Sequence, residues 1–446
     1  MSQPAFLTAQ FITCVVVLVV VVHAILVAAA YEIYLERKIS AYIQDRVGPN
    51  RVGFDFGLPA LKFLRGCLGL GQPLADGLKF FLKEDFTPGK VDKVLFTLAP
   101  MAAVIPALIG FAILPWGGNW EFPTFTIPLV HWTIQGGPVQ ITGAVANVGV
   151  IYLLAVASLG VYGVTLGGWA GNNKYSFLGG LRCTAQMLAY EIPLGLSLLA
   201  ALLLYADVRP GGIVQYQHDH GWLIFSQPIP AIIFFISILA EANRAPFDNA
   251  ECEQELVGGY HTEYSSMRFA LFFLAEYSHM FTSSAFFALL FLGGYELLPF
   301  VHDPLTSIGA TSFLAVIAKF VVYYAKAILL VCFMMVVRWT LPRLRFDQVM
   351  MMAWQAIIPI SLAMVVVTSV MVYLGLTATA PMFLANAGVA AGLLVVYPWL
   401  PKARLNRRIP LYGSRFNPVP GEVVRTRPTH ETALEDRPIQ GIAAAR

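Results

Sequence analysis

The residues best suited to proton chemistry gather in one short stretch, residues 241–264, which reads EANRAPFDNAECEQELVGGYHTEY. Only 12% of the chain's residues are charged, yet six of its 26 acidic residues lie here beside a single arginine, Arg244. Carboxylates that crowd together in partial burial repel one another, and this repulsion raises the proton affinity of some of them. The stretch therefore predicts a place where protons are taken up or passed on, by Glu241, Asp248, Glu251, Glu253, Glu255 and Glu263.

A solvated acidic face that binds a basic partner would give the same sequence pattern, and both interpretations can hold together. Glu251 and Glu255 are four residues apart, so they would share one face if this segment is helical, which would strengthen their repulsion.

Ionisable residues also lie inside apolar runs. Glu276 lies in the middle of one run with His279 one turn later, and Glu191 precedes Pro193 in another. A charge at the centre of a bilayer costs about 2.5–3.5 kcal/mol on insertion scales, so such residues usually face a cavity or a partner. Buried ion pairs that only fix helix packing are one interpretation. A hydrated proton path is favoured because several of these acids lie near the same, cytoplasmic end of their spans. Other ionisable residues within or at the ends of apolar runs are Glu32, Glu36, Lys319 and Lys326.

These residues need a membrane scaffold to position them. The hydrophobic fraction is 57%, above the 45–50% that is typical of soluble domains. Apolar runs of about 20 residues recur, and each is long enough to cross a bilayer as a helix. The sequence predicts an all-α, polytopic helix bundle of eight or nine transmembrane helices. The candidate spans are 11–33, 94–114, 143–166, 185–206, 222–241, 265–292, 312–337, 354–376 and 381–399.

The connections between these spans differ strongly in charge. Residues 35–93, 167–184, 242–264, 338–353 and the tail from 400 carry 25 of the 29 lysines and arginines. The connections on the other side carry only Arg209. The positive-inside rule places the first set in the cytoplasm and the amino terminus outside. The sequence thus predicts a multi-pass membrane protein with this orientation, and it contains no basic block typical of nucleic-acid binding.

Three further segments do not look like spans. Residues 60–84 predict an amphipathic helix at the cytoplasmic interface, with apolar residues on one face and Asp76 and Lys79 on another. The loop 115–142 predicts a compact lid, and the basic, proline-rich tail 401–446 predicts an extended segment or one laid on a partner. The five cysteines include no C-x-x-C pair, which argues against a metal or an iron–sulfur site in this chain.

Six motifs, in order and on matching sides of matching spans, carry a family resemblance. They are ERK and QDRVGPNRVG within 36–53, GQPLADGLKFFLKE at 71–84, NKYSFLGGLRCTAQMLAYEIPLGL at 173–196, the acidic stretch itself, FFLAEYSHM at 272–280 and RWTLPRLRFDQVM at 338–350. From about residue 31 to 365 the chain resembles the H-subunit family of bacterial NADH–quinone oxidoreductase, respiratory complex I.

The resemblance implies a subunit of the bacterial inner membrane, with its amino terminus in the periplasm, that anchors the peripheral redox arm to the membrane arm. Residues 1–400 would form a transmembrane domain with a long quinone tunnel. The chain itself would bind no cofactor, since quinone is the substrate and the iron–sulfur cluster that reduces it belongs to a neighbouring subunit. The expected partners are the quinone-site subunits of the peripheral arm, the small and antiporter-like membrane subunits, and lipid.

The resemblance also assigns roles to individual residues. A proton path would use Glu191, Glu241, Glu251, Glu253, Glu255, Glu263 and Glu276. The quinone tunnel would be lined by Glu36, Arg37, Arg46, Asp76, Lys79, Arg244, Asp248, Arg338, Arg343, Arg345 and Asp347.

Two other functions remain open from sequence. One is the homologous membrane component of a membrane-bound hydrogenase. The other is a stand-alone proton-coupled carrier, which the lack of a detectable internal repeat disfavours. The choice between ubiquinone and menaquinone also stays open.

Overall fold

The computed structural model describes residues 8–54, 66–127, 132–299 and 303–396. The chain divides into two compact units, 1–390 and 391–446. The tail predicted for 401–446 and the first part of the predicted amphipathic segment at 60–84 lie outside the described residues.

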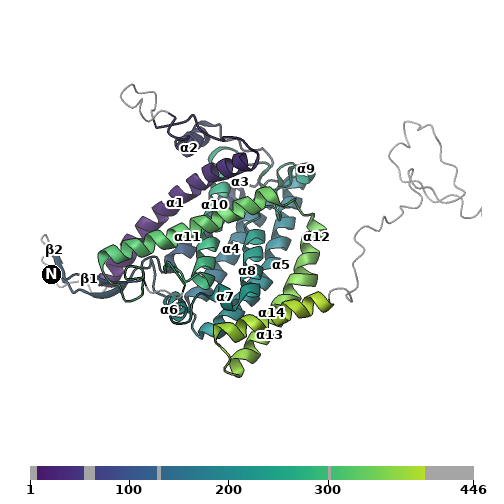
Figure 1. Ribbon diagram of the computed structural model, residues 1–446. Coiled ribbons are helices and arrows are strands. Elements are labelled where there is room, and N and C mark those ends of the chain that lie inside the picture. The colour runs from purple at the N-terminus through teal and green to yellow at the C-terminus, as the bar shows by residue number, and fades with distance from the viewer. Residues whose placement is uncertain (1–7, 55–65, 128–131, 300–302, 397–446) are drawn as a thin grey trace, which may run out of the picture. The chain divides into compact units, whose positions relative to one another are not determined.

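Long helices dominate the first unit (Figure 1). Six helical segments are long and apolar enough to cross a membrane. They are α1 (Ala9–Ile43), α3 (Lys93–Ile109) with the 3₁₀ turn Gly110–Ile113, α4 (Gly149–Ala170), α5 (Lys174–Tyr205), α11 (Phe313–Thr340), and the continuous run Phe346–Tyr373 of α12 (Phe346–Met351), a π-helical stretch (Met352–Ile357) and α13 (Ile358–Tyr373). The chain is therefore a multi-pass membrane protein.

Each of the nine segments predicted to span the membrane contains a helix in the described part of the chain. Three of these helices fall short of a full span by length or apolarity: α8 (Pro228–Glu241), α10 (Ser266–Phe291) and α14 (Thr379–Val396). Helix α10 is long enough, but its polar residues, including Glu276 and His279, lower its hydropathy. The prediction of a polytopic helical fold is confirmed.

Several boundaries differ from the prediction because polar residues continue two of the helices. Helix α1 runs on to Ile43 rather than to residue 33, and Glu36 and Lys38 in this extension are buried. Helix α5 begins eleven residues before the predicted start at 185, where the Asn173 side chain accepts from the Tyr175 amide and caps the helix. The segment predicted at 222–241 divides into α7 (Leu223–Ser226) and α8, which begins at Pro228.

Two short elements lie at opposite ends of the bundle. Helix α2 (Gln72–Leu82) covers the second half of the predicted amphipathic segment, begins with a proline in its first turn, and packs against α1 and α10. The predicted lid at 115–142 forms two antiparallel pairs, β1 (Asn119–Phe122) with β4 (Gly137–Gln140) and β2 (Phe125–Ile127) with β3 (Trp132–Ile134). The short strands were not anticipated from sequence.

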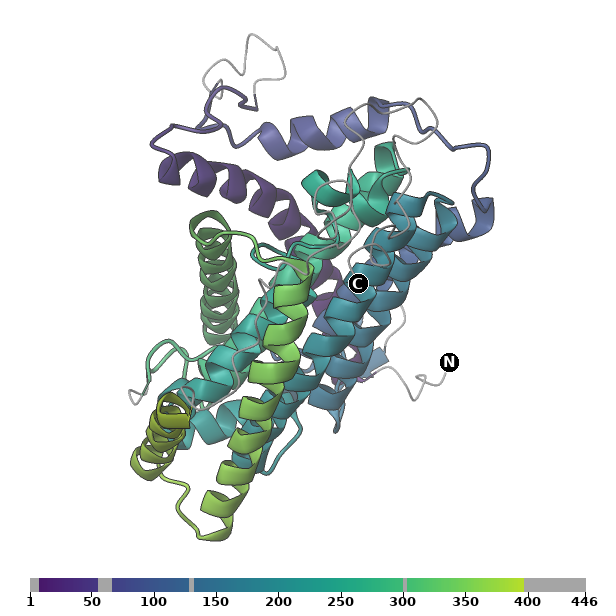
Figure 2. The ribbon, with the colours of Figure 1, turned by 90° about the vertical axis from the view of Figure 1, so that its right-hand side faces the viewer.

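The core surrounds α10, which packs against α1, α3, α8 and α11. Figure 2 shows the long helices running side by side, with α2 across one end. Near its carboxyl end α10 buries an unbroken apolar run, including Phe286, Phe287 and Phe291, against the Phe234 ring of α8. Its first half instead carries polar residues toward the loop between α8 and α10. The same helix thus combines the core with the candidate site.

Candidate functional site

The acidic loop between α8 and α10 is folded inward, and a glutamine in the middle of α5 holds it. Gln186 is fully buried, and its side-chain amide donates to the carbonyl oxygens of Ala240 (2.9 Å) and Phe247 (2.7 Å). The Asn249 amide donates back to Gln186 Oε1 at 3.4 Å. These contacts fix residues on both sides of Arg244. The loop is therefore a buried, ordered element in its first half.

Arg244 lies at the centre of the site, where its guanidinium stacks over the Tyr277 ring at 4.2 Å. Its nearest carboxylates are Glu36, 3.5 Å from Nη1, and Glu276, 3.8 Å from Nη2. Both distances exceed those of tight hydrogen bonds. The buried Nε and Nη2 atoms have no hydrogen-bond acceptor among the described residues. Arg244 thus keeps donors that a bound molecule could use.

Glu36 joins α1 to two other helices. Its Oε1 lies 2.6 Å from Arg338 Nη1 at the end of α11, and its Oε2 accepts from the Tyr277 hydroxyl of α10 at 2.6 Å. We refer to Glu36, Arg244, Tyr277 and Arg338 as the arginine cluster. The Tyr277–Glu36 contact is a charge-assisted hydrogen bond, which is about twice as strong as a neutral one. Together with the Arg338–Glu36 ion pair it fixes α1, α10 and α11 relative to one another.

A second ion pair ties the acidic loop to the segment after α11. Arg343 Nη2 lies 2.5 Å from Asp248 Oδ2, and Arg343 Nη1 donates to Cys252 Sγ at 3.0 Å. Burial raises the pKa of Asp248 above its ordinary value, while Arg343 opposes this shift. The pair holds the loop against the chain that follows α11.

Glu251 and Glu276 meet at one tyrosine. The Tyr260 hydroxyl, which is fully buried, lies 2.7 Å from Glu276 Oε1 and 3.2 Å from Glu251 Oε1. His261 Nδ1 is 3.5 Å from the same Glu251 oxygen. Burial is the main cause of a raised pKa at Glu251, with the Asp248 carboxylate adding to it. A carboxyl in this setting can hold a proton above the ordinary carboxylate range.

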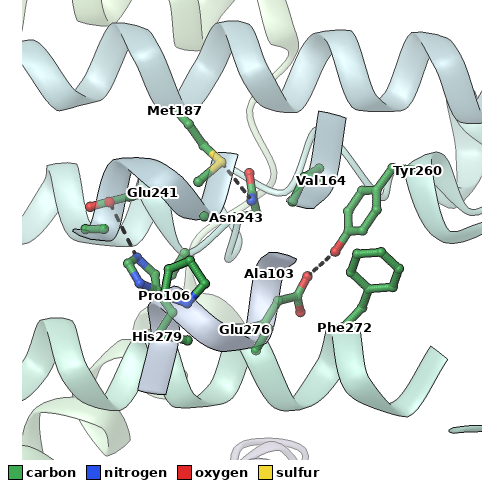
Figure 3. A pocket seen from close by; sticks show the side chains of 15 residues that line it. Ala103, Pro106, Val164, Met187, Glu241, Asn243, Tyr260, Phe272, Glu276 and His279 are labelled. Atoms are coloured by element: carbon green, nitrogen blue, oxygen red, sulfur yellow. Dashed lines mark hydrogen bonds and ion pairs between the residues drawn. The ribbon is translucent and has the colours of Figure 1, made fainter. Parts of the chain in front are cut away.

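A small cavity separates this pair of acids from the next acid (Figure 3). It has a volume of about 50 Å³ and is lined by Tyr260 and Glu276 at one end and by His279 and Glu241 at the other. His279 Nε2 lies 3.6 Å from Glu241 Oε1. Since one water needs about 10–15 Å³ of such space, a few waters fit between Glu276 and Glu241.

The line of acids continues into α5. A second cavity of about 30 Å³ shares Glu241 and His279 and extends past Ser283. Glu191 of α5 is half-buried, and Glu241 is the charged group that acts on it. Glu191 itself lines neither cavity. The described structure therefore brings three predicted proton-path residues, Glu251, Glu276 and Glu241, into one sequence, and Glu191 lies within electrostatic reach of Glu241.

An apolar cavity of about 190 Å³ lies between α1, α2 and α10. Its lining is mostly apolar, with Tyr34, Gln72, Asp76 and Tyr277 as the polar side chains. Tyr277 also belongs to the arginine cluster, so the cavity reaches that cluster from the side of α2. At its mouth, Arg37 Nη1 pairs with Asp76 Oδ2 at 2.7 Å.

Two predicted proton-path acids are engaged elsewhere. Glu255 is exposed and lies 2.5 Å from Arg182 of α5, and Glu263 accepts from the Asn173 amide at 2.7 Å. Glu251 and Glu255 would share a face only if the whole segment were helical, and this condition is not met. The short helix α9 (Glu253–Leu256) begins after Glu251, so Glu251 turns inward while Glu255 points out.

Four predicted tunnel residues are exposed and do not join the arginine cluster in the described structure: Arg46, Lys79, Arg345 and Asp347. The backbone of Glu253 belongs to α9, but its side chain lies outside the described residues. Within the described part of the chain, no group of three His, Cys, Asp or Glu side chains is arranged to hold a metal ion.

Sequence reasoning left out three residues that organise the site: Gln186, Tyr260 and Tyr277. Each is buried, and each connects predicted residues that are distant in sequence. The only available signal was the position of Tyr277 directly after Glu276 and of Tyr260 within the acidic stretch.

Comparison with known proteins identifies the family of the chain. The model of the NADH dehydrogenase family matches residues 15–369. The chain is 43% identical over 366 residues to an H subunit of the NADH-quinone oxidoreductase of Geobacter sulfurreducens, covering 82% of this chain and 96% of that protein. It is 41% identical over 349 residues to the corresponding protein of Cytophaga hutchinsonii, covering 78% and 93%. The chain therefore belongs to the NADH dehydrogenase family and is a membrane subunit of an oxidoreductase complex of the NADH–quinone type.

Proposed function

We propose that this chain forms the quinone-reduction site of that complex and couples quinone reduction to proton translocation. The observation that carries the proposal is the apolar cavity between α1, α2 and α10, which reaches Tyr277 and the arginine cluster. The names of the relatives favour the quinone enzyme over the hydrogenase alternative.

The cavity suits an amphiphile with an apolar tail and a polar, redox-active head. Its lining is largely apolar, and its outer side is formed by α2, whose exposed Leu78, Phe81 and Leu82 face away from the bundle. A quinone tail would lie among the apolar side chains. The quinone oxygens would reach the free Arg244 donors, Nε and Nη2. A guanidinium there favours the negative charge that develops on the oxygens during reduction.

Quinone reduction consumes two electrons and two protons. The electrons would come from an iron–sulfur cluster in a neighbouring subunit. The protons would reach the quinone through the buried acids, because the largely apolar lining of the cavity offers few groups that bind water. Glu36 lies 3.5 Å from Arg244 Nη1 and accepts a hydrogen bond from the Tyr277 hydroxyl, and the Tyr277 side chain lines the cavity. A carboxylate in that position can relay protons to a quinone oxygen.

The remaining acids would carry the charge change away from the quinone. A new negative charge beside Arg244 alters the electrostatic potential at Glu276, which lies 3.8 Å from the same guanidinium. Glu276 shares Tyr260 with Glu251 and borders the cavity that leads to Glu241. Protonation changes can thus pass from Glu276 to Glu241 and on to Glu191, at the half-exposed face of α5. Glu255 and Glu263 would instead hold the loop to α5.

The proposal also includes the setting of the protein. The arginine cluster would lie on the cytoplasmic side of a bacterial inner membrane and the amino terminus in the periplasm, an orientation that the charge asymmetry of the loops supports. The peripheral arm would cover the arginine cluster from that side. The small and antiporter-like membrane subunits would receive the proton signal beyond Glu191.

A photoreactive quinone applied to the intact complex tests this function. Cross-links are expected in residues 29–34 of α1 or 267–277 of α10, and excess native quinone should suppress them. Filling the cavity by Ala270→Phe should reduce both labelling and quinone reduction, while electron transfer from NADH to a water-soluble acceptor continues. Val19→Phe on the exposed side of α1 is the matched control. Labelling confined to other subunits, with Ala270→Phe fully active, would refute the proposal.

A further inference from the structure

One buried carboxyl near the arginine cluster has no part in the path described so far. Glu32 lies one helical turn before Glu36 on α1 and is only 1% exposed. Neither of its carboxyl oxygens accepts a hydrogen bond from any group in the described part of the chain. A carboxyl of this kind, fully enclosed and without a donor, is rare because polar groups are normally paired when they are buried.

The surroundings of Glu32 are defined by α1, α11 and the acidic loop. Arg244 and Glu36 are the charged groups that act on it. On α11, Tyr324 and Cys332 are the titratable groups that Glu32 acts on in turn. The Tyr324 hydroxyl donates to the Ala24 carbonyl oxygen at 2.9 Å and is therefore committed elsewhere. Glu32 thus lies behind the arginine cluster, on the side of α11.

The physical cost of charge decides the state of this carboxyl. An ionised carboxylate without a partner is far more expensive to bury than the neutral acid. Neither arginine of the site pairs with Glu32, since Arg338 lies 2.6 Å from Glu36 and Arg244 lies between Glu36 and Glu276. Two carboxylates one turn apart on a helix also repel each other. The arrangement is therefore stable with Glu36 ionised and Glu32 carrying a proton.

We propose that Glu32 is a proton reserve for the quinone site, an inference that rests on the proposed function. When the quinone is reduced, the O–H bond of Glu32 breaks and its proton moves to the Glu36 carboxylate. Glu36 passes a proton on to a quinone oxygen, where a new O–H bond forms. The electrons come from the neighbouring subunit's cluster. Glu32 is left as a carboxylate, its charge offset by Arg244, until the acidic loop returns a proton.

The arrangement has a direct consequence for rate. A reserve beside the site supplies the first proton without waiting for transfer along the acids of the loop. The competing possibility is a static acid that only fills the space between α1 and α11. A static acid never changes its protonation state during turnover, and this difference is measurable.

Time-resolved infrared difference spectra of the intact complex, recorded as its quinone is reduced and before the acidic loop returns a proton, provide the test. The parent complex should lose one carbonyl-stretch band of a protonated carboxyl on reduction, with a shift in deuterated water. Glu32→Gln should abolish that band, whereas Thr13→Val, another buried polar position on α1, should retain it. A band that persists unchanged in Glu32→Gln, or no Glu32-dependent band in the parent, overturns the proposal.

A kinetic measurement separates this inference from the proposed function. Glu32→Gln should bind the photoreactive quinone normally and lower quinone reduction by roughly three- to tenfold at alkaline pH, with little loss at acidic pH. Removal of a sole general acid would lower the rate by a factor of about 10². The expected loss is smaller because the acidic loop still supplies protons. Equal loss at every pH would indicate a structural role and refute the reserve. Failure of the parent to label at all would instead refute the quinone site.

If Glu32→Gln fails to assemble, Glu32→Asp provides the same comparison. The aspartate keeps a carboxyl, so its redox-dependent band should persist at a shifted frequency. An assembled Glu32→Asp complex that shows no such band overturns the proposal.

Discussion

Removal of a single hydroxyl should interrupt the path between the acidic loop and α10. The Tyr260 hydroxyl joins Glu276 at 2.7 Å and Glu251 at 3.2 Å. Tyr260→Phe deletes it without changing the ring, which packs edge-on against Phe272 with centroids 5.3 Å apart. No large cavity forms, so the change acts on the hydrogen bonds alone.

The size of the effect follows from the type of hydrogen bond that is lost. A hydrogen bond to a charged group contributes about 1.5–3 kcal/mol. If that stabilisation applies to proton passage between the two acids, the rate of passage should fall by roughly 10- to 150-fold. Quinone reduction should fall less, because electrons and the first proton reach the quinone by other routes. Tyr260→Phe should therefore lower proton pumping more than quinone reduction.

The assay compares NADH-driven acidification of inverted membrane vesicles with quinone reduction in the same vesicles. Tyr264→Phe is a matched control from the same loop, because the Tyr264 hydroxyl is buried with no hydrogen-bond partner among the described residues. The control should pump normally. Full pumping by Tyr260→Phe, or an equal loss in both variants, would refute the assignment of Tyr260 to the proton path.

Three further changes test the loop. Arg343→Met removes the cation that pairs with the buried Asp248 carboxylate, so the complex should lose about 1.5–3 kcal/mol of stability. Thermal unfolding of the solubilised complex measures this loss, and an unchanged unfolding midpoint would contradict the prediction. Burial raises the pKa of Glu251, so the folded state binds this proton more tightly than the unfolded state. Stability should therefore fall as pH rises above the ordinary value of 4.5, and the fall should be shallower in Glu251→Gln; parallel profiles would argue against it. Gly259→Ala would place a Cβ 1.8 Å from the Ala250 carbonyl oxygen at a φ of +63°, so it should displace the loop and abolish pumping; normal pumping would show that the loop adapts.

The sequence was sufficient for helix type but not for helix length. Apolar runs of span length leave little choice of structure in a membrane, so the helices could be predicted from hydrophobicity alone. The first turns of α5 contain Gly179, Gly180 and Arg182, which are typical of a loop. They are helical because the glycines allow close packing: an added Cβ on Gly179 would lie 2.7 Å from Gly259 Cα. Such a contact with a distant segment is invisible to local propensity.

The candidate site could be predicted by residue type but not by pairing. Carboxylates in an apolar chain are conspicuous, and this made Glu36, Glu276 and Glu241 predictable. Their partners required the fold, since Arg338 reaches Glu36 from the far end of the described chain. Tyrosines such as Tyr277 are also ordinary core residues in a helix bundle, so their type alone predicts no role.

The modest hydropathy of α10 has a consequence for how the protein is made. A translocon releases helices into lipid according to their apolarity, and an acidic residue such as Glu276 opposes that release. Helices α1 and α3, against which α10 packs, are synthesised earlier and are strongly apolar. Insertion of α10 should therefore depend on α1 and α3 being already inserted next to it. A nascent chain that ends after α10 should integrate this helix efficiently, and one that also lacks α1 should leave it outside the bilayer. The polar side chains on which the chemistry depends would thus make biogenesis a cooperative process.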